Sequence, residues 1–96
     1  MFVIEGLDGP GRGEAREMHR AAHVAYLRSA GERFVIGGPF LDQNGVSIGS
    51  MVVLEAVSQA DAEAFAAADP FVLNSVYETV TVRRWSFGHL RDSGRG

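Results

Sequence analysis

Hydrophobic and polar residues follow one another along this chain with a period that changes several times. Phe2–Leu7 is a short apolar run closed by the turn-forming residues Asp8–Gly11, which predicts a strand followed by a loop. From residue 13 to residue 30 apolar residues recur at three- and four-residue steps without a proline, and Gly31 follows. This spacing predicts an amphipathic helix that ends at the glycine. Its expected apolar stripe consists of Ala15, Met18, Ala22, Tyr26 and Ala30.

The middle of the chain predicts two strands joined by a hairpin. Arg33–Gly37 contains a run of three apolar residues, and we expect the strand to end where Gly37–Pro39 turns the backbone. Asn44–Gly45 is a strong hairpin signal, because both residues tolerate positive φ. The next strand is expected at residues 47–55.

The following segment contains two signals for the start of a helix. Ser58, with Asp61 three residues later, resembles a capping box and predicts a second helix that ends near Ala68. In Asp69–Pro70, an N-cap residue is followed by proline at the first helical position, which predicts a further short turn of helix.

The last strand completes a recognisable order of elements. Val76–Phe87 alternates apolar and polar residues, whereas residues 89–96 are polar and glycine-rich, so we expect a domain over residues 1–88 and a flexible tail. The order strand, helix, strand, strand, helix, strand predicts an α+β, ferredoxin-like βαββαβ fold: a four-stranded antiparallel sheet with both helices on one face.

The helices leave the other face of such a sheet exposed, and another surface must pack against it. A chain this short leaves much of its surface exposed, and a second copy is the obvious partner. We expect a homodimer that packs sheet against sheet, with Val53, Val80, Val82 or the residues that alternate with them in the interface.

Composition narrows the classes of function. The 96 residues allow one domain, and 46% apolar with 22% charged residues is ordinary for a globular protein. A net charge of −3 argues against binding to nucleic acid or to anionic membranes. The absence of cysteine excludes disulfides, thiolate nucleophiles and Cys-ligated metals. No signal peptide or membrane span is evident, so a cytoplasmic location is expected.

A set of short motifs occurs in a characteristic order along the chain. The motifs are Arg20–His23, Gly38–Pro39, Gly49–Ser50, Glu55, Asp69–Phe71 and Val76–Glu78. Together they resemble the YciI-like (YCII-related domain) family from Met1 to about Trp85. The resemblance implies a ferredoxin-like fold, usually in a dimeric α/β barrel-like assembly, with a His/Asp pair in a cleft as the catalytic site.

The resemblance also assigns positions in this sequence. It implies that His23 and Asp69 form the pair, and that the substrate-binding neighbours are Arg20, Gly38, Pro39, Gly49 and Ser50. Most members have no assigned reaction, and a few are reported to act on chlorinated muconolactone-type intermediates. The family often has tyrosine where this chain has Phe71.

Each member of the pair also has a structural explanation. His23 suits general acid–base catalysis, because imidazole has an unperturbed pKa of ~6.5, yet it could equally be a boundary histidine satisfied by a nearby acceptor. Asp69 is what an N-cap alone would select, although one carboxylate oxygen can cap a helix while the other orients a histidine.

Other candidates are weaker. His19 and His23 share a spacing that can chelate a metal, but the sequence defines no third ligand, and we expect no metal. Gly9–Gly13 fits neither phosphate-binding pattern and is explained by a plain strand–helix connection. Ser50 could be a nucleophile or a hydrogen-bond donor, and Arg20 could bind an anion or be a solvated charge.

Two functions remain open from the sequence. In the first, the protein is a cofactor-independent enzyme of the lyase, dehydrohalogenase or isomerase type, in which His23 and Asp69 move a proton on a small carboxylate or lactone. In the second, it is a non-catalytic dimeric module that binds a ligand or another protein. The fold alone does not decide between them.

Overall fold

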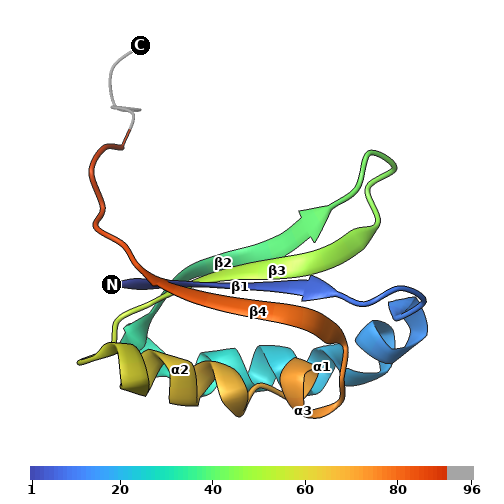
Figure 1. The fold of residues 1–96 in the computed structure, drawn as a ribbon, viewed down its shortest axis with the longest axis horizontal. Helices are drawn as coiled ribbons and strands as arrows, with labels where there is room; N and C mark the ends of the chain where they lie inside the picture. Colours follow the sequence, from blue (N-terminus) through green and yellow to red (C-terminus); the bar gives the residue numbers. More distant parts are fainter. Residues whose placement is uncertain (91–96) are drawn as a thin grey trace.

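The structure is a computed structural model that describes residues 1–90 of the chain. One sheet lies above a layer of helices, as Figure 1 shows. The strands are β1 (Phe2–Asp8), β2 (Phe34–Leu41), β3 (Ser47–Leu54) and β4 (Tyr77–Arg84). The helices are α1 (Gly13–Ser29), α2 (Gln59–Ala67) and α3 (Pro70–Leu73), with a 3-10 turn at Gly31–Arg33.

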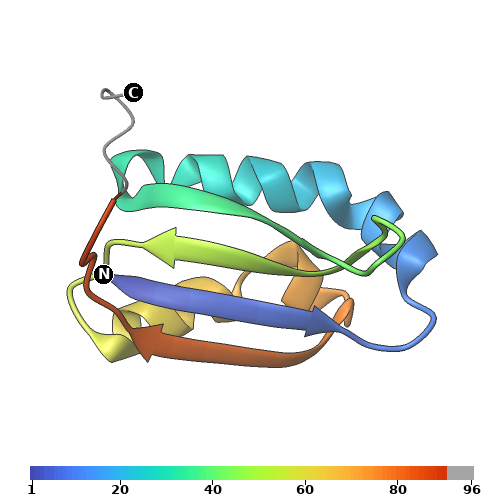
Figure 2. The same ribbon diagram turned by 90° about the horizontal axis from the view of Figure 1, so that it is seen from above.

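The sheet has the predicted topology. Its strand order is β2-β3-β1-β4, and each neighbouring pair is antiparallel. Seen from above, α1 lies along the β2 side of the sheet, whereas α2 and α3 lie beneath β1 and β4 (Figure 2). The four-stranded antiparallel sheet with its helices on one face is therefore confirmed.

Local signals placed the end of α1, the start of α2 and the β2–β3 hairpin correctly. The Ser58 side chain caps α2 by accepting a hydrogen bond from the Asp61 backbone N–H. Gly31 follows α1 with a φ of +62°, a backbone conformation that glycine adopts without the steric cost of a Cβ. The β2–β3 hairpin turns at Gly45, whose φ is +82°, and Asp42 accepts two backbone N–H hydrogen bonds within the turn.

The predicted turn at Gly37–Pro39 was wrong. β2 continues through these residues to Leu41, and Pro39 pairs with Ser50 of β3. β2 is an edge strand, where a residue without a backbone N–H can face away from the ladder. A proline that would interrupt a central strand is therefore accommodated here.

The predicted apolar stripe of α1 was also misplaced. Met18 is 77% exposed and Ala22 is exposed, whereas Arg16 and His23 are buried. The inward face of the helix thus carries charged and polar side chains. It was missed because a pattern search follows apolar residues only.

The structure decides which of the two alternating sets of residues in the last strand faces the helices. Val80 and Val82 do not lie on the uncovered face but against α2, where they line a hollow with Ala66. Val82 pairs with Ile4, a core residue that faces the helices, and Val80 lies two residues away on the same strand; the register shift between Leu7 and Asp8 lies beyond both. Thr79 and Thr81 lie on the uncovered face instead.

The hydrophobic core lies between the sheet and α2. Its buried centre is formed by Ile4, Val52, Leu54 and Ala66, and the partly buried residues packed around it include Leu27, Phe34, Phe65 and Val82. No helix among the described residues is both long and apolar enough to cross a membrane. Of the expected tail, residues 91–96 lie outside the described part of the chain.

Candidate functional site

A cleft of about 380 Å³ opens between α1 and the β2–β3 pair. α1 packs more closely against α3 than against these two strands, so space remains between part of the helix and this half of the sheet. The α1 side of the cleft is lined by Arg16, Arg20, His23, Val24, Leu27 and Arg28. The sheet side is lined by Phe34, Gly37, Gly38, Pro39, Ser47, Ser50 and Val52.

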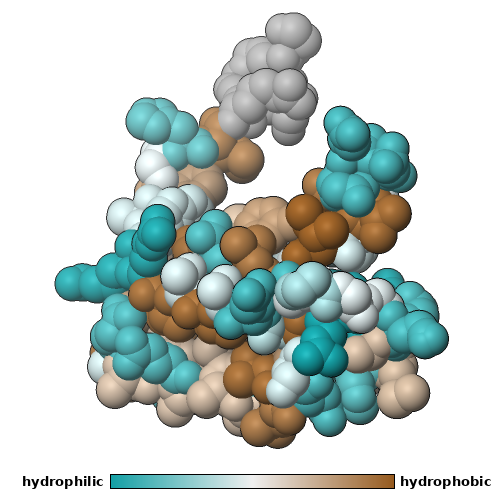
Figure 3. Space-filling model, turned by 45° about the vertical axis from the view of Figure 1, so that its right-hand side comes forward, coloured by the Kyte–Doolittle hydropathy of each residue, from teal (hydrophilic) through white to brown (hydrophobic). Residues whose placement is uncertain are grey.

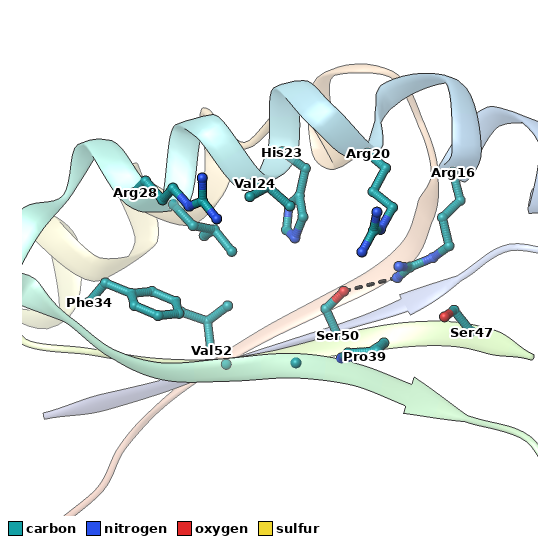
Figure 4. A pocket seen from close by; sticks show the side chains of 13 residues that line it. Arg16, Arg20, His23, Val24, Arg28, Phe34, Pro39, Ser47, Ser50 and Val52 are labelled. Carbon is teal, nitrogen blue, oxygen red and sulfur yellow. Dashed lines mark hydrogen bonds between the residues drawn. The ribbon is translucent and has the colours of Figure 1, made fainter. Parts of the chain in front are cut away.

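His23, which lines this cleft between Arg20 and Arg28, is paired with Asp69, which lies outside the lining. The Nδ1 atom of His23 lies 2.8 Å from Oδ1 and 2.9 Å from Oδ2 of Asp69, and each residue is 7% exposed. An ionised carboxylate can only accept hydrogen bonds, so we assign the imidazole proton to Nδ1. In the neutral form of the ring, Nε2 is then the nitrogen without a proton, at the tip of the side chain that Figure 4 shows extending from α1 into the cleft.

Asp69 serves two purposes at once. It is the N-cap of α3, where its Oδ1 atom accepts the backbone N–H of Phe71 at 2.8 Å, and Pro70 occupies the first turn of the helix. The same carboxylate accepts from His23 with both oxygens. The backbone of α3 thus fixes the carboxylate, and the carboxylate fixes the imidazole.

Phe71 supports the imidazole from a second direction. Its ring is fully buried and stacks on the His23 ring with a centroid distance of 4.0 Å and an interplanar angle of 11°. The guanidinium of Arg16 lies 4.7 Å from the same ring centroid. Phe71 therefore positions both His23 and Arg16, and this role does not require the hydroxyl of a tyrosine.

Arg16 forms a second buried ion pair. Its Nε donates to Asp8 Oδ2 at 2.7 Å, and its Nη2 donates to Asp8 Oδ1 at 3.2 Å and to Ser50 Oγ at 2.9 Å. The Arg16 and Asp8 side chains are only 9% and 8% exposed. Figure 4 shows the contact with Ser50 at one end of the cleft.

One nitrogen of Arg16 is left for a ligand. Nη1 makes no hydrogen bond within residues 1–90, yet in that part of the chain every fully buried side-chain N or O atom has a partner. Nη1 is therefore accessible, and Arg16 lines the cleft. Its two N–H groups can donate to an oxygen of a bound molecule.

Tyr77 lies behind this end of the cleft. Burial, reinforced by the nearby Asp69 and Asp8 carboxylates, raises the pKa of Tyr77 to about 12, while the neighbouring Ser50 hydroxyl and the charge of Arg16 act in the opposite direction. The ring lies over Gly6, where a Cβ would come within 2.5 Å of it. Tyr77 is thus a neutral phenol that supports Ser50 from beneath.

The predicted site residues come together with one exception. His23 and Asp69 are hydrogen-bonded, and Arg20, Gly38, Pro39 and Ser50 line the cleft (Figure 4). Gly49 does not line it. A Cβ at Gly49 would lie 2.5 Å from the carbonyl oxygen of Gly6, so this glycine allows β1 and β3 to approach.

Sequence reasoning missed Arg16, Asp8 and Tyr77. Arg16 lies seven residues before His23 and four before Arg20, so helical spacing alone places it on the His23 face. Asp8 was interpreted only as the first residue of a turn-forming run, and nothing local marks it as a partner of Arg16. Within residues 1–90 no group of three or more His, Cys, Asp or Glu side chains is placed to hold a metal ion.

The fold and the cleft define a small ferredoxin-like α+β protein with a buried His/Asp pair beside an arginine-lined cavity. The chain belongs to the YCII-related domain family, whose pattern matches residues 1–86. No curated protein matches the sequence significantly.

Solved structures similar to this chain include the following two. One is 5-chloro-2-hydroxyhydroquinone dehydrochlorinase (TftG) from Burkholderia phenoliruptrix AC1100, in complex with 2,5-dihydroxybenzoquinone. It is 32% identical with a TM-score of 0.83, covering 91% of this chain and 94% of its own. The other is PA3566 from Pseudomonas aeruginosa, 17% identical with a TM-score of 0.50 over 88% of this chain and 92% of its own, a likeness of fold alone.

Proposed function

We propose that this protein is a cofactor-independent enzyme in which His23 and Asp69 perform acid–base chemistry on a small carboxylate, lactone or related oxygen-rich ring. The observation that carries the proposal is the immobilised imidazole. Asp69 holds its Nδ1, Phe71 holds its plane, and the ring projects into a cleft that contains no carboxylate side chain. A neutral imidazole so placed can accept a proton at Nε2.

The carboxylate of Asp69 would balance the charge that proton transfer creates. When Nε2 takes a proton, the ring becomes an imidazolium whose Nδ1–H donates to an ionised acceptor already in place. No reorganisation is needed at that moment, which is the condition for an electrostatic contribution to catalysis. This use of the pair also explains why Asp69 is not turned wholly into its helix cap.

The oxygen that gains charge would be held at the Arg16 end of the cleft. The accessible Nη1 of Arg16 can donate two hydrogen bonds, and the Ser50 hydroxyl lies beside it. The sequence had suggested Arg20 or Ser50 for this role. We now assign it chiefly to Arg16, because its guanidinium is fixed by Asp8 before any ligand arrives.

Elimination of a halide is the reaction type with most support, because the similar structure with 32% identity is that of a dehydrochlorinase. His23 would remove a proton, the electron pair of that bond would form the new double bond, and chloride would leave with the electrons of the carbon–chlorine bond. The products are an unsaturated ring or chain, chloride and a proton. The step is balanced without an oxidant or reductant.

We further propose that the uncovered sheet face pairs with a second copy. Exposed apolar side chains lie on or beside it, among them Leu7 at 49%, Ile36 at 59% and Ile48 at 42%. In Figure 3 hydrophobic atoms gather along the upper surface, away from the helices and toward the β2–β3 hairpin. A second copy presents the same surface and would cover it symmetrically.

The catalytic proposal is tested with chlorinated ring substrates. Chloride release is measured with 5-chloro-2-hydroxyhydroquinone, the compound named for the similar structure, and with chlorinated lactones. We expect turnover by the parent protein and a loss of roughly 10²–10⁴-fold in His23→Ala. His19→Ala, one turn away and not in the cleft lining, is the matched control and should keep full activity. Binding without turnover in the parent protein would favour the non-catalytic module.

A further inference from the structure

The cleft has a second cationic end that the proposed chemistry does not use. Its lining contains three arginines and no Asp or Glu, in a protein whose net charge is −3. The charge of Arg16 is offset by Asp8 in a buried pair. Arg20 and Arg28 make no ion pair with any residue in the range 1–90, so two positive charges in the lining remain uncompensated.

These two arginines lie at different points along the cleft. They are eight residues apart on α1, which corresponds to ~12 Å along the helix axis. Figure 4 shows Arg20 beside His23 and the Ser50 end, and Arg28 above Phe34 at the other end. Polar groups thus mark both ends of an elongated space.

The wall between them is apolar. Val24 and Leu27 from α1 face Phe34 and Val52 from the sheet. Gly37 keeps this floor flat, because a Cβ there would come within 3.1 Å of the Phe34 ring and 3.0 Å of the carbonyl oxygen of Met51. A ring or hydrocarbon chain fits here, whereas a charged group would find no partner.

The size of the cleft agrees with an elongated ligand. An apolar cavity of ~150 Å³ accommodates one benzene molecule. The cleft measures about 380 Å³, which leaves room for a further group beyond a single ring. One ring held at His23 would leave the Arg28 end empty.

Resting on the proposed function, we infer that the substrate is an elongated dianion: one anionic oxygen binds near Arg16 and Arg20, an apolar body lies along Val24 and Leu27, and a distal carboxylate binds to Arg28. Arg28 is then the residue that selects for a second acidic group. It touches no part of the reacting centre, so it governs affinity and not the chemical step.

Acids of increasing chain length can measure the distance between the two anion-binding ends of the cleft. Straight-chain α,ω-dicarboxylates from succinate to sebacate, each paired with the monocarboxylate of equal chain length, are titrated calorimetrically into the whole protein. The parent protein should prefer one diacid length over its monoacid by at least about tenfold, which corresponds to ~1.4 kcal/mol. In Arg28→Gln we expect the diacid to fall to the affinity of its monoacid, while the monoacid changes less than about twofold.

Two further variants complete the design. Arg28→Lys keeps the charge without the planar fork and should restore part of the preference. Arg12→Gln removes an exposed arginine at the N-cap of the same helix, where its side chain makes no capping bond, and should change neither affinity. Equal affinities for diacids and monoacids in the parent protein, or an equal loss for both in Arg28→Gln, would overturn the inference.

The experiments distinguish failure of the catalytic proposal from failure of the dianion proposal. His23→Ala should abolish chloride release and keep the diacid preference. If the preference holds in the parent protein but no substrate is turned over, the dianion site stands and the catalytic proposal falls. If chloride is released and diacids are bound no better than monoacids, the reverse is true.

Discussion

His23 Nδ1 lies within 2.9 Å of both carboxylate oxygens of Asp69, and one of these oxygens also caps α3. This double use makes a sharp test possible, because the two roles respond differently to one substitution. Asparagine is an N-cap of nearly equal quality to aspartate, but it carries no charge to balance an imidazolium.

In Asp69→Asn we therefore expect stability to hold within about 0.5 kcal/mol while activity falls by on the order of 10²-fold or more. Urea denaturation measures the first quantity and chloride release the second. Asp69→Ala should lose activity and also ~1 kcal/mol of stability, because the cap is removed as well. Nitrogen chemical shifts of the His23 ring report whether Nδ1 still carries the proton. Unchanged activity and unchanged ring shifts in Asp69→Asn would show that the pair is structural.

The Arg16–Asp8 pair predicts a large effect on stability. Both side chains are almost fully buried, so removal of one leaves the other charge without a partner. Arg16→Gln should lower the free energy of unfolding by about 3 kcal/mol. Arg12→Gln, at an exposed position just before α1, is the control and should be neutral.

A double-mutant cycle isolates this interaction. The Asp8→Asn/Arg16→Gln variant should be more stable than the sum of the single losses predicts, because it leaves no uncompensated charge. Additive losses would mean that the two side chains contribute independently, and the assignment of Arg16 as a preorganised donor would lose its basis.

Local chemistry explains which parts of the fold the sequence could predict. The helix caps at Ser58 and Asp69 each depend on one side chain and on the few residues that follow it. Gly31 and Gly45 each have a positive φ. Such signals do not depend on tertiary structure. The βαββαβ order followed from them. Asp69 was singled out as a site residue by the resemblance to the YciI-like family, because its cap alone has a purely structural explanation.

The errors arose where tertiary context decides. Whether Pro39 ends a strand depends on whether that strand lies at the edge of the sheet, which no local pattern records. Which of the two alternating sets of β4 residues faces the helices depends on the register with β1, where Val82 pairs with the core residue Ile4. Arg16 was missed because a charged side chain is expected in water unless a buried partner such as Asp8 is known.

Tyr77 gives a prediction for pH. Burial raises its pKa to about 12, above the ~10 expected in the unfolded chain. The stability that this difference contributes is fully present below pH ~10 and is lost as the pH rises through the folded pKa near 12. The loss should be on the order of 2 kcal/mol.

Tyrosinate absorbance and chemical denaturation between pH 9 and pH 12 measure this effect. Tyr77→Phe is the control, since it keeps the ring over Gly6 and removes the ionisable hydroxyl. We expect its stability to fall less steeply over the same range. Tyr26, whose pKa burial also raises, remains in both proteins and provides a common background. Identical pH profiles for the two proteins would contradict the assignment.

The uncovered sheet face leads to the last prediction, on assembly. Ile36 pairs with Val53 of β3 on the side away from the helices and is 59% exposed in the single chain. Ile36→Glu places a charge where a second copy would bury it, whereas in a monomer the carboxylate would remain in water. We expect the parent protein to sediment as a dimer at micromolar concentration and Ile36→Glu to sediment as a monomer with unchanged helix content. Val57→Glu, at a position 95% exposed in the loop before α2, is the matched control and should stay dimeric. A parent protein with the mass of one chain would refute the pairing, and a dimer that survives Ile36→Glu would move the interface away from this face.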